Sequence, residues 1–129
     1  MFTKPEVLTL ASSLAAHAAS RQSAITQNVA NADTPGYRAK DVADFATTYQ
    51  AQDGNGLRQT RSGHIGSTPS QTRFAASDRI EPGVLSPNGN GVSLETEMVK
   101  AAEVRHDHDM ALAVYSKSLG ILRASLGRR

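Results

Sequence analysis

The densest group of chemically active side chains lies near the C-terminus, at Glu103, His106, Asp107, His108 and Asp109. Carboxylates and imidazoles can bind metal ions or act as general acids and bases. Two ligands on one helix face need a spacing of three or four residues, whereas the two histidines are two apart. On a helix they point in different directions, so the cluster predicts a polar surface and not a metal or acid-base site.

The sequence contains no motif for the other common kinds of reactive site. The chain has no cysteine, which excludes a disulfide framework, a thiol nucleophile and cysteine-based zinc sites. Serine, histidine and aspartate occur without the sequence context of a hydrolase triad, and no glycine-rich phosphate loop follows a strand. We interpret His17 and His64 as packing or surface residues. The sequence therefore predicts a protein that is not an enzyme and has no cofactor or small-molecule substrate.

Composition limits the size of the core. The 129 residues include 19 alanines and no tryptophan, and only 5% are aromatic. The formal net charge is +2, and the basic residues are spread along the chain, which argues against a nucleic-acid partner. This composition favours alanine-rich helices that need partners over a thick globular core.

Neither a membrane span nor a cleaved leader is expected. The longest apolar run, Met110 to Tyr115, is far shorter than the ~20 residues that cross a bilayer. Residues 16–18 fit an A-x-A cleavage site, but Glu6 balances Lys4 and the helical pattern continues through the supposed cut.

An N-terminal unit of residues 1–33 reads as one helix from Thr3 to about Asn31. Thr3 and Glu6 stand at the capping-box spacing. Apolar residues then recur three and four apart, with small side chains that suit close approach by another helix. The residues expected to pack are Ala11, Leu14, Ala18 and Ile25.

The middle of the chain lacks a regular pattern. Residues 34–52 are expected to hold a turn and a short following segment. Residues 53–91 are rich in Gly, Ser, Asn and Pro, with no sustained helical or strand period. We predict an irregular, partly extended loop there, with a short strand near His64–Ile65 or Arg79–Ile80.

Residues 92–129 form the second helical unit. Ser93 is the expected N-cap, acidic residues follow in the first turn, and Gly127 suits a C-terminal stop. We predict that Leu112, Tyr115, Leu119 and Leu122 pack against the N-terminal helix. The expected fold is thus mainly α, with long terminal helices pairing as a coiled-coil-like bundle around an irregular middle segment. The packing residues expected on this helix are Leu94, Met98, Ala101, Leu112, Tyr115, Leu119, Leu122 and Leu126.

A turn motif follows the first helix. Pro35 disfavours helical geometry at Thr34, and Pro35-Gly36 fits a type II turn in which glycine supplies the positive φ. Asn31 and Asp33 are expected to accept hydrogen bonds from backbone amides at the helix end. From spacing alone, the motif indicates only a helix C-terminus followed by a turn. The motif residues are Asn28, Ala30, Asn31, Asp33, Thr34, Pro35, Gly36 and Tyr37.

The run from Asn28 to Tyr37, extended to Asp41 and Phe45, resembles the N-terminal signature of the flagellar rod and hook axial proteins. A second block, Gly89 to Met98, is similar to the start of that family's C-terminal helix. The two blocks occur in the family's order at opposite ends of the chain. Hook and distal-rod members carry a large inserted domain for which 129 residues leave no space, so the resemblance favours a short, proximal rod member.

The resemblance implies a structural subunit of the periplasm-spanning rod. Such proteins assemble with copies of themselves and with other rod proteins, and they contact the membrane-embedded ring and the adaptor at the rod base. They leave the cell through the flagellar type III export apparatus without a cleaved signal peptide, and Phe2 to Leu8 is the expected export signal. Head-to-tail contacts suit such an assembly because they can grow as an open helix.

Two alternatives remain from the residues themselves. One is a small helical binding module or secretion chaperone with a discrete oligomeric state. The other is a secreted basic helical peptide that acts on nucleic acid or membrane, which is disfavoured because neither helix has a basic face.

Overall fold

The computed structural model describes residues 6–53, 74–79 and 86–127. Two long helices dominate it, in agreement with the mainly α fold predicted from the sequence. Between them lie two short strands and one short helix. In chain order the elements are α1 (Glu6–Ala30), β1 (Lys40–Val42), α2 (Phe45–Asp53), β2 (Ala76–Asp78) and α3 (Leu94–Ser125).

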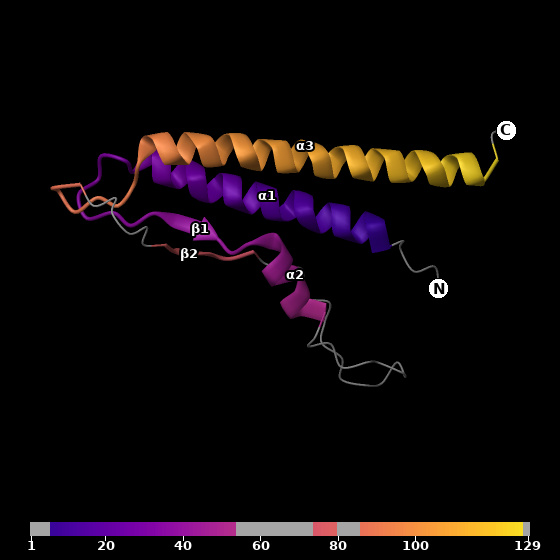
Figure 1. Cartoon of the computed structure of the whole chain (residues 1–129), viewed down its shortest axis with the longest axis horizontal. Helices are drawn as coiled ribbons and strands as arrows, with labels where there is room; N and C mark the ends of the chain where they lie inside the picture. Colours follow the sequence, from indigo (N-terminus) through magenta and orange to yellow (C-terminus); the bar gives the residue numbers. More distant parts are fainter. Residues whose placement is uncertain (1–5, 54–73, 80–85, 128–129) are drawn as a thin grey trace.

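The long helices lie side by side and run in opposite directions (Figure 1). α3 has 32 residues and α1 has 25. The end of α1 lies beside the start of α3, next to the turn motif of residues 28–37, which we call the signature turn (Figure 1). The C-terminal turns of α3 therefore extend past Glu6, the first described residue of α1 (Figure 1).

Small and β-branched side chains form the seam between the helices. Ala18 and Ile25 of α1 pack with Val104 of α3, and each is only 2% exposed, with Ala101 packed against the cluster. Ala11 is buried as well, and Leu14 is half-buried. The alanines keep the backbones close, which is the role that their heptad spacing predicts.

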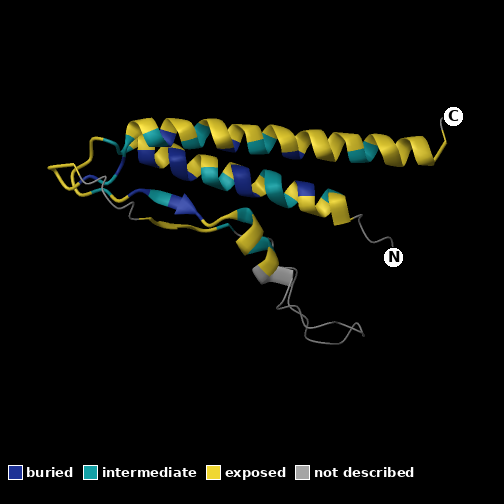
Figure 2. Ribbon diagram, in the orientation of Figure 1, coloured by how far each residue is buried: buried dark blue, intermediate teal, exposed yellow. Residues whose placement is uncertain are grey.

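The packing face predicted for the second helix is only partly right: Ala101 packs in the seam as expected, but the buried row lies one position before the predicted Met98 and Leu112 row. The buried row of α3 is Glu97, Val104 and Ala111, whereas Leu112, Tyr115 and Leu122 are exposed and Leu119 is half-buried. The prediction from apolar periodicity placed only apolar residues in the seam and did not include Glu97. Glu97 is nevertheless buried there, because Asn28 and Lys100 satisfy its carboxylate. The C-terminal part of α3 is mostly exposed (Figure 2).

The connection after α1 forms a second layer beneath it. Strands β1 and β2 pair antiparallel, with Lys40 opposite Asp78 and Val42 opposite Ala76. β2 lies beside the expected Arg79–Ile80 strand, and Arg79 N–H continues the ladder by donating to Ala39 O at 2.7 Å. The sequence patterns did not predict β1 or α2. The other proposed strand, at His64–Ile65, lies outside the described residues.

The helix ends follow the predicted chemistry where they are described. Ser93 is extended and accepts a hydrogen bond from Thr96 N–H, as an N-cap does. Gly36 and Gly127 have φ of +70° and +83°, which fits the turn after α1 and the stop after α3. Thr3 of the expected capping box and residues 2–5 of the expected export signal lie outside the described residues.

Replacing Ile25 should test the seam. Ile25→Ala removes a buried side chain between two helices, and we expect the free energy of unfolding to fall by about 2–5 kcal/mol. Val29→Ala is the matched control, because Val29 is 41% exposed on the same helix. Urea denaturation followed by circular dichroism measures both variants. Equal losses in the two variants would contradict the seam.

Candidate functional site

Asn90 joins the signature turn to the second sequence block. Its side chain is 1% exposed, and its Nδ2 donates to the carbonyl oxygens of Asn31 at 3.0 Å, Ala32 at 2.7 Å and Thr34 at 2.8 Å. Its Oδ1 accepts from Val92 N–H at 2.7 Å. The two N–H groups of this amide are thus shared among three carbonyl oxygens of the turn that follows α1, and two of these oxygens also accept from backbone N–H groups.

Backbone hydrogen bonds tie the same two blocks together. Gly36 N–H donates to Asn88 O at 3.2 Å, and Gly91 N–H donates to Tyr37 O at 3.0 Å. Within the turn, Tyr37 N–H bonds to Thr34 O at 3.3 Å, which closes the predicted type II turn. The two blocks lie more than fifty residues apart in sequence and form one junction, which we call the signature junction.

Asn28 holds three elements at once. Its side-chain amide bonds both the N–H and the carbonyl of Lys40, at 2.9 and 2.7 Å, as a neighbouring strand would. Its Nδ2 also donates to Glu97 Oε2 at 2.9 Å. Lys100 Nζ lies 3.0 Å from the other carboxylate oxygen of Glu97. Both Asn28 and Glu97 are 1% exposed, so α1, β1 and α3 meet at a satisfied, buried polar cluster.

Asp41 in β1 forms a second polar cluster. Arg21 Nε donates to its Oδ1 at 3.0 Å, Arg79 approaches its Oδ2 at 3.3 Å, and Val42 N–H donates to Oδ1 at 2.8 Å. Burial acts to raise the pKa of Asp41, but the hydrogen bonds from Arg21 and Val42, with the charges of Arg21 and Lys100, outweigh it. The net result is a lowered pKa.

His17 fixes the start of α2. Its Nε2–H donates to Ala43 O at 2.8 Å, so the ring carries a proton on that nitrogen. Edge-on contacts place the ring 5.5 Å from Phe45 and 4.9 Å from Phe74, centroid to centroid. The interpretation of His17 as a packing residue agrees with this arrangement.

One face of the hairpin is hollowed. A groove of about 750 Å³ runs between α1 and α3, with mostly small side chains in its walls. The lining residues are Ala18, Ala19, Gln22, Ala101, Ala102, Val104, Arg105 and His108. An open groove with alanine walls has room for another helix at close approach.

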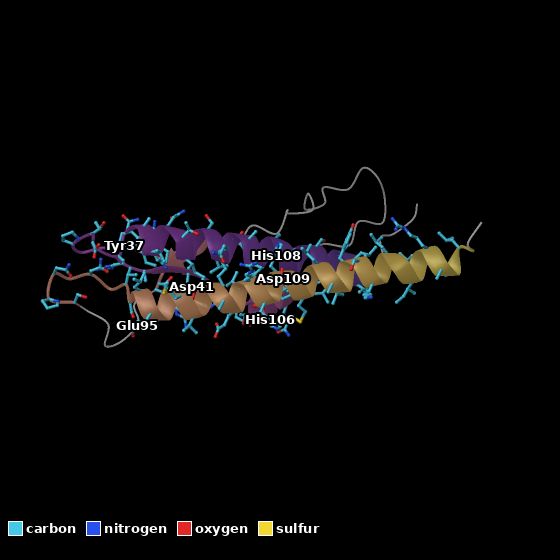
Figure 3. All side chains as sticks on the ribbon, turned by 90° about the horizontal axis from the view of Figure 1, so that it is seen from above. Tyr37, Asp41, Glu95, His106, His108 and Asp109 are labelled. Atoms are coloured by element: carbon cyan, nitrogen blue, oxygen red, sulfur yellow. The ribbon has the colours of Figure 1, made fainter. Side chains whose placement is uncertain are left out.

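The acid and histidine cluster is spread around α3. His106 and His108 project to opposite sides of the helix, and His108 lies toward α1 (Figure 3). Within residues 6–53, 74–79 and 86–127, no three His, Cys, Asp or Glu side chains come together as metal ligands. None of the helices in that part of the chain is long and apolar enough to cross a membrane.

Comparison with known proteins identifies the family of this chain. The sequence profile of the family described as flagella basal body rod protein matches residues 8–38, which include most of α1 and the whole signature turn. Over 109 residues, the chain is 33% identical to the flagellar basal body rod protein FlgB of Agrobacterium fabrum, with 81% of each chain covered. The chain belongs to the FlgB family. FlgB proteins of Cereibacter sphaeroides and Escherichia coli are 33% and 31% identical to it, covering 83% and 76% of this chain.

In this FlgB family member, the sequence motif marked the right place but not all of its partners. The structure brings Asn28, Asn31, Thr34, Gly36 and Tyr37 into one junction. Asn31 and Asp33 were expected to accept from backbone amides. Instead, Asn31 Oδ1 accepts from the Thr34 hydroxyl at 3.2 Å, Asp33 is exposed, and Asn90 binds the turn's carbonyls. Ala30 and Pro35 are exposed.

Sequence reasoning missed the long-range polar partners. Glu97 was predicted to stabilise the first helical turn through the helix dipole, and Asn90 was placed in the irregular middle segment. The pairing of Arg21 with Asp41 was not predicted. The available signal was the second block itself, which resembles a block that follows the first in the family's order although it lies far from the first block in sequence. The bonds of Asn28 and Asn90 cross 69 and up to 59 residues, which periodicity cannot reveal.

Asn28→Asp should convert the buried amide cluster into a charge conflict. The new carboxylate cannot donate to Lys40 O, and it faces the carboxylate of Glu97. We expect a loss of about 2 kcal/mol or more in the free energy of unfolding at neutral pH. Because like charges raise both pKa values, the loss should shrink as the solution is acidified. Asn31→Asp, a half-buried neighbour, is the matched control for urea denaturation across pH. A pH-independent loss would contradict this geometry.

The lowered pKa of Asp41 predicts acid sensitivity of a defined sign. A carboxyl group whose pKa is lower in the folded than in the unfolded state stabilises the fold above the unfolded value, here 3.8. That contribution is lost as pH falls through the folded value. The stability difference between the wild-type chain and Asp41→Asn should therefore be constant near neutral pH and shrink below pH 3.8. Asp44→Asn, at an exposed position nearby, is the control variant.

Proposed function

We propose that this chain is a structural subunit of the proximal flagellar rod, which assembles with copies of itself and with other rod proteins through the outward faces of α1 and α3. Its membership of the FlgB family supports a structural role in the flagellar basal body rod and not an enzymatic one. The observation that carries the proposal is an apolar row on α3 that the chain's own fold leaves exposed.

This row, which we call the outer row, contains large side chains on one side of α3. Leu94 and Met98 are one turn apart, and Leu112 and Leu126 follow at heptad multiples. Their exposed fractions are 49%, 66%, 50% and 86%. An amphipathic helix with a second apolar face is typical of a protein whose core is completed by association.

The outer row continues into the groove between the helices. Arg105 lies at the heptad position between Met98 and Leu112 and also lines the groove. A helix of a neighbouring subunit could therefore contact the outer row and the alanine-walled groove together. In this proposal, the row and groove of one subunit bind a different surface of the next subunit. Such a head-to-tail contact grows as an open helix and can form a tube.

The packing residues divide between two kinds of contact in this proposal. Ala11, Ala18 and Ile25 form the intrachain seam with Ala101, while Leu94, Met98, Leu112 and Leu126 serve neighbouring subunits. Tyr115 and Leu122 lie on the C-terminal part of α3, where exposure again favours contact with a second molecule. The seam thus sets the shape of each subunit, and the outer row joins the subunits.

The remaining partners follow from the position of a proximal rod protein. In this proposal the chain contacts the membrane-embedded ring and the adaptor at the rod base, and the assembled rod crosses the periplasm as drive shaft and export channel. The chain passes through the flagellar type III export apparatus without cleavage of a leader. No nucleic acid or small-molecule substrate takes part.

Leu112→Asp tests the outer row. The substitution places a charge in the proposed interface but leaves the intrachain seam intact, because Leu112 is 50% exposed. We expect cells with only this variant to lose rod assembly and swimming, measured by isolation of basal bodies and by motility in soft agar. The purified variant should keep its helix content and its urea midpoint.

Ala113→Asp is the matched control. Ala113 is exposed and lies about 100° around the helix from Leu112, so the same charge falls outside the outer row. Normal swimming with Leu112→Asp would contradict the proposal. Sedimentation of the wild-type chain separates the alternative, since a secretion chaperone should form a stable, discrete dimer and a rod subunit should polymerise or remain a monomer without its partners.

A further inference from the structure

An unusual chemical pattern lies at the start of the second sequence block and includes the residue before it, Asn88. Asn88-Gly89 and Asn90-Gly91 follow one another directly, and Asn55-Gly56 lies outside the described residues. Asparagine before glycine is the sequence most prone to spontaneous deamidation, because glycine has no side chain to hinder attack by its own backbone nitrogen. The rod-subunit proposal does not use this chemistry.

We propose that Asn90-Gly91 is a deamidation site that is closed in the folded chain and open in the unfolded chain. In the reaction, the deprotonated backbone nitrogen of Gly91 attacks Cγ of Asn90, a C–N bond forms, and Nδ2 leaves as ammonia. Water then opens the succinimide ring to give aspartate or isoaspartate. Water is consumed and ammonia released, and no oxidant or reductant is needed.

The fold closes the site by binding each reacting group. Nδ2, the leaving group, is held by three carbonyl oxygens, and Oδ1 is bound by Val92 N–H at 2.7 Å. The attacking nitrogen of Gly91 donates to Tyr37 O at 3.0 Å. With the Asn90 side chain 1% exposed, ring closure requires the signature junction to open first.

Asn88 has no comparable side-chain anchor. It is exposed, and its Oδ1 accepts from Asn90 N–H at 3.1 Å, while its Nδ2 makes no hydrogen bond within the described part of the chain. The Gly89 nitrogen bonds to Ser86 O at 2.8 Å, so the turn slows attack there but leaves the side chain open to solvent. The two neighbouring asparagines therefore differ in protection although their local sequences match.

Modification of Asn90 is incompatible with the signature junction. Aspartate has no N–H to donate, so its carboxylate would face the carbonyl oxygens of Asn31, Ala32 and Thr34 in a buried site. Isoaspartate adds a backbone atom at the same place. A chain that is modified while unfolded thus loses the ability to close the junction, and the reaction records how long each chain has remained unfolded.

Site-resolved mass spectrometry of the full chain tests this inference. The chain is incubated at mildly alkaline pH across a urea series, with a stabilising osmolyte at the native end, and circular dichroism gives the helical fraction of each sample. The rate of deamidation, seen as conversion of the side-chain amide to a carboxyl group, is measured at Asn90 and at Asn88. We expect the Asn90 rate to be at least about tenfold below the Asn88 rate in the most helical sample and equal to it in high urea.

Variants separate the chemistry from the fold. Gly91→Ala should slow deamidation of Asn90 in urea without disturbing the junction, because the added Cβ would meet only Tyr37 O at 3.7 Å. Asn90→Asp should lower the urea midpoint strongly, whereas Asn88→Asp keeps the acceptor for Asn90 N–H and should not. A rate ratio that does not change with helical fraction would overturn the proposal, as would a wild-type midpoint for Asn90→Asp. Neither result depends on whether the chain assembles into a rod.

Discussion

The structure depends on the need to satisfy backbone polar groups where α1 ends. A helix leaves its last carbonyls without partners, and burying them unpaired destabilises the fold. Asn90 supplies the donors for three carbonyls of this turn, and Asn28 pairs with both backbone groups of Lys40. Because the two amides bind elements distant in sequence, satisfying the helix end also determines how α1, β1 and α3 are joined.

The hairpin of α1 and α3 follows from that junction. Once the two helices start side by side, the alanines of α1 permit a close seam with Val104 and Ala111. The seam itself buries few large side chains, so it contributes modest hydrophobic stabilisation. The buried clusters around Asn28 and Asp41 supply orientation, since charged and amide groups stay buried only with their specific partners.

The core is thin and an apolar row is exposed for the same reason, which is where the chain places its large apolar side chains. Four large apolar side chains of α3 lie outside the intrachain seam: Leu94, Met98, Leu112 and Leu126. In an isolated molecule this arrangement leaves apolar surface in water, but in an assembly the same surface is covered. The alanine-rich composition is therefore consistent with the proposed subunit, which packs small residues within itself and would present large ones to its neighbours.

Local sequence is enough to predict the two long helices, the cap at Ser93, the type II turn at Gly36 and the family. Each depends on local spacing or on residues that follow one another, so they can be read along the chain. Three outcomes arise only in the folded chain: which row of α3 faces α1, the burial of Glu97, and the closure of the turn by Asn90. Those outcomes depend on hydrogen bonds between residues far apart in sequence, and a buried carboxylate reverses the pattern that apolar periodicity predicts.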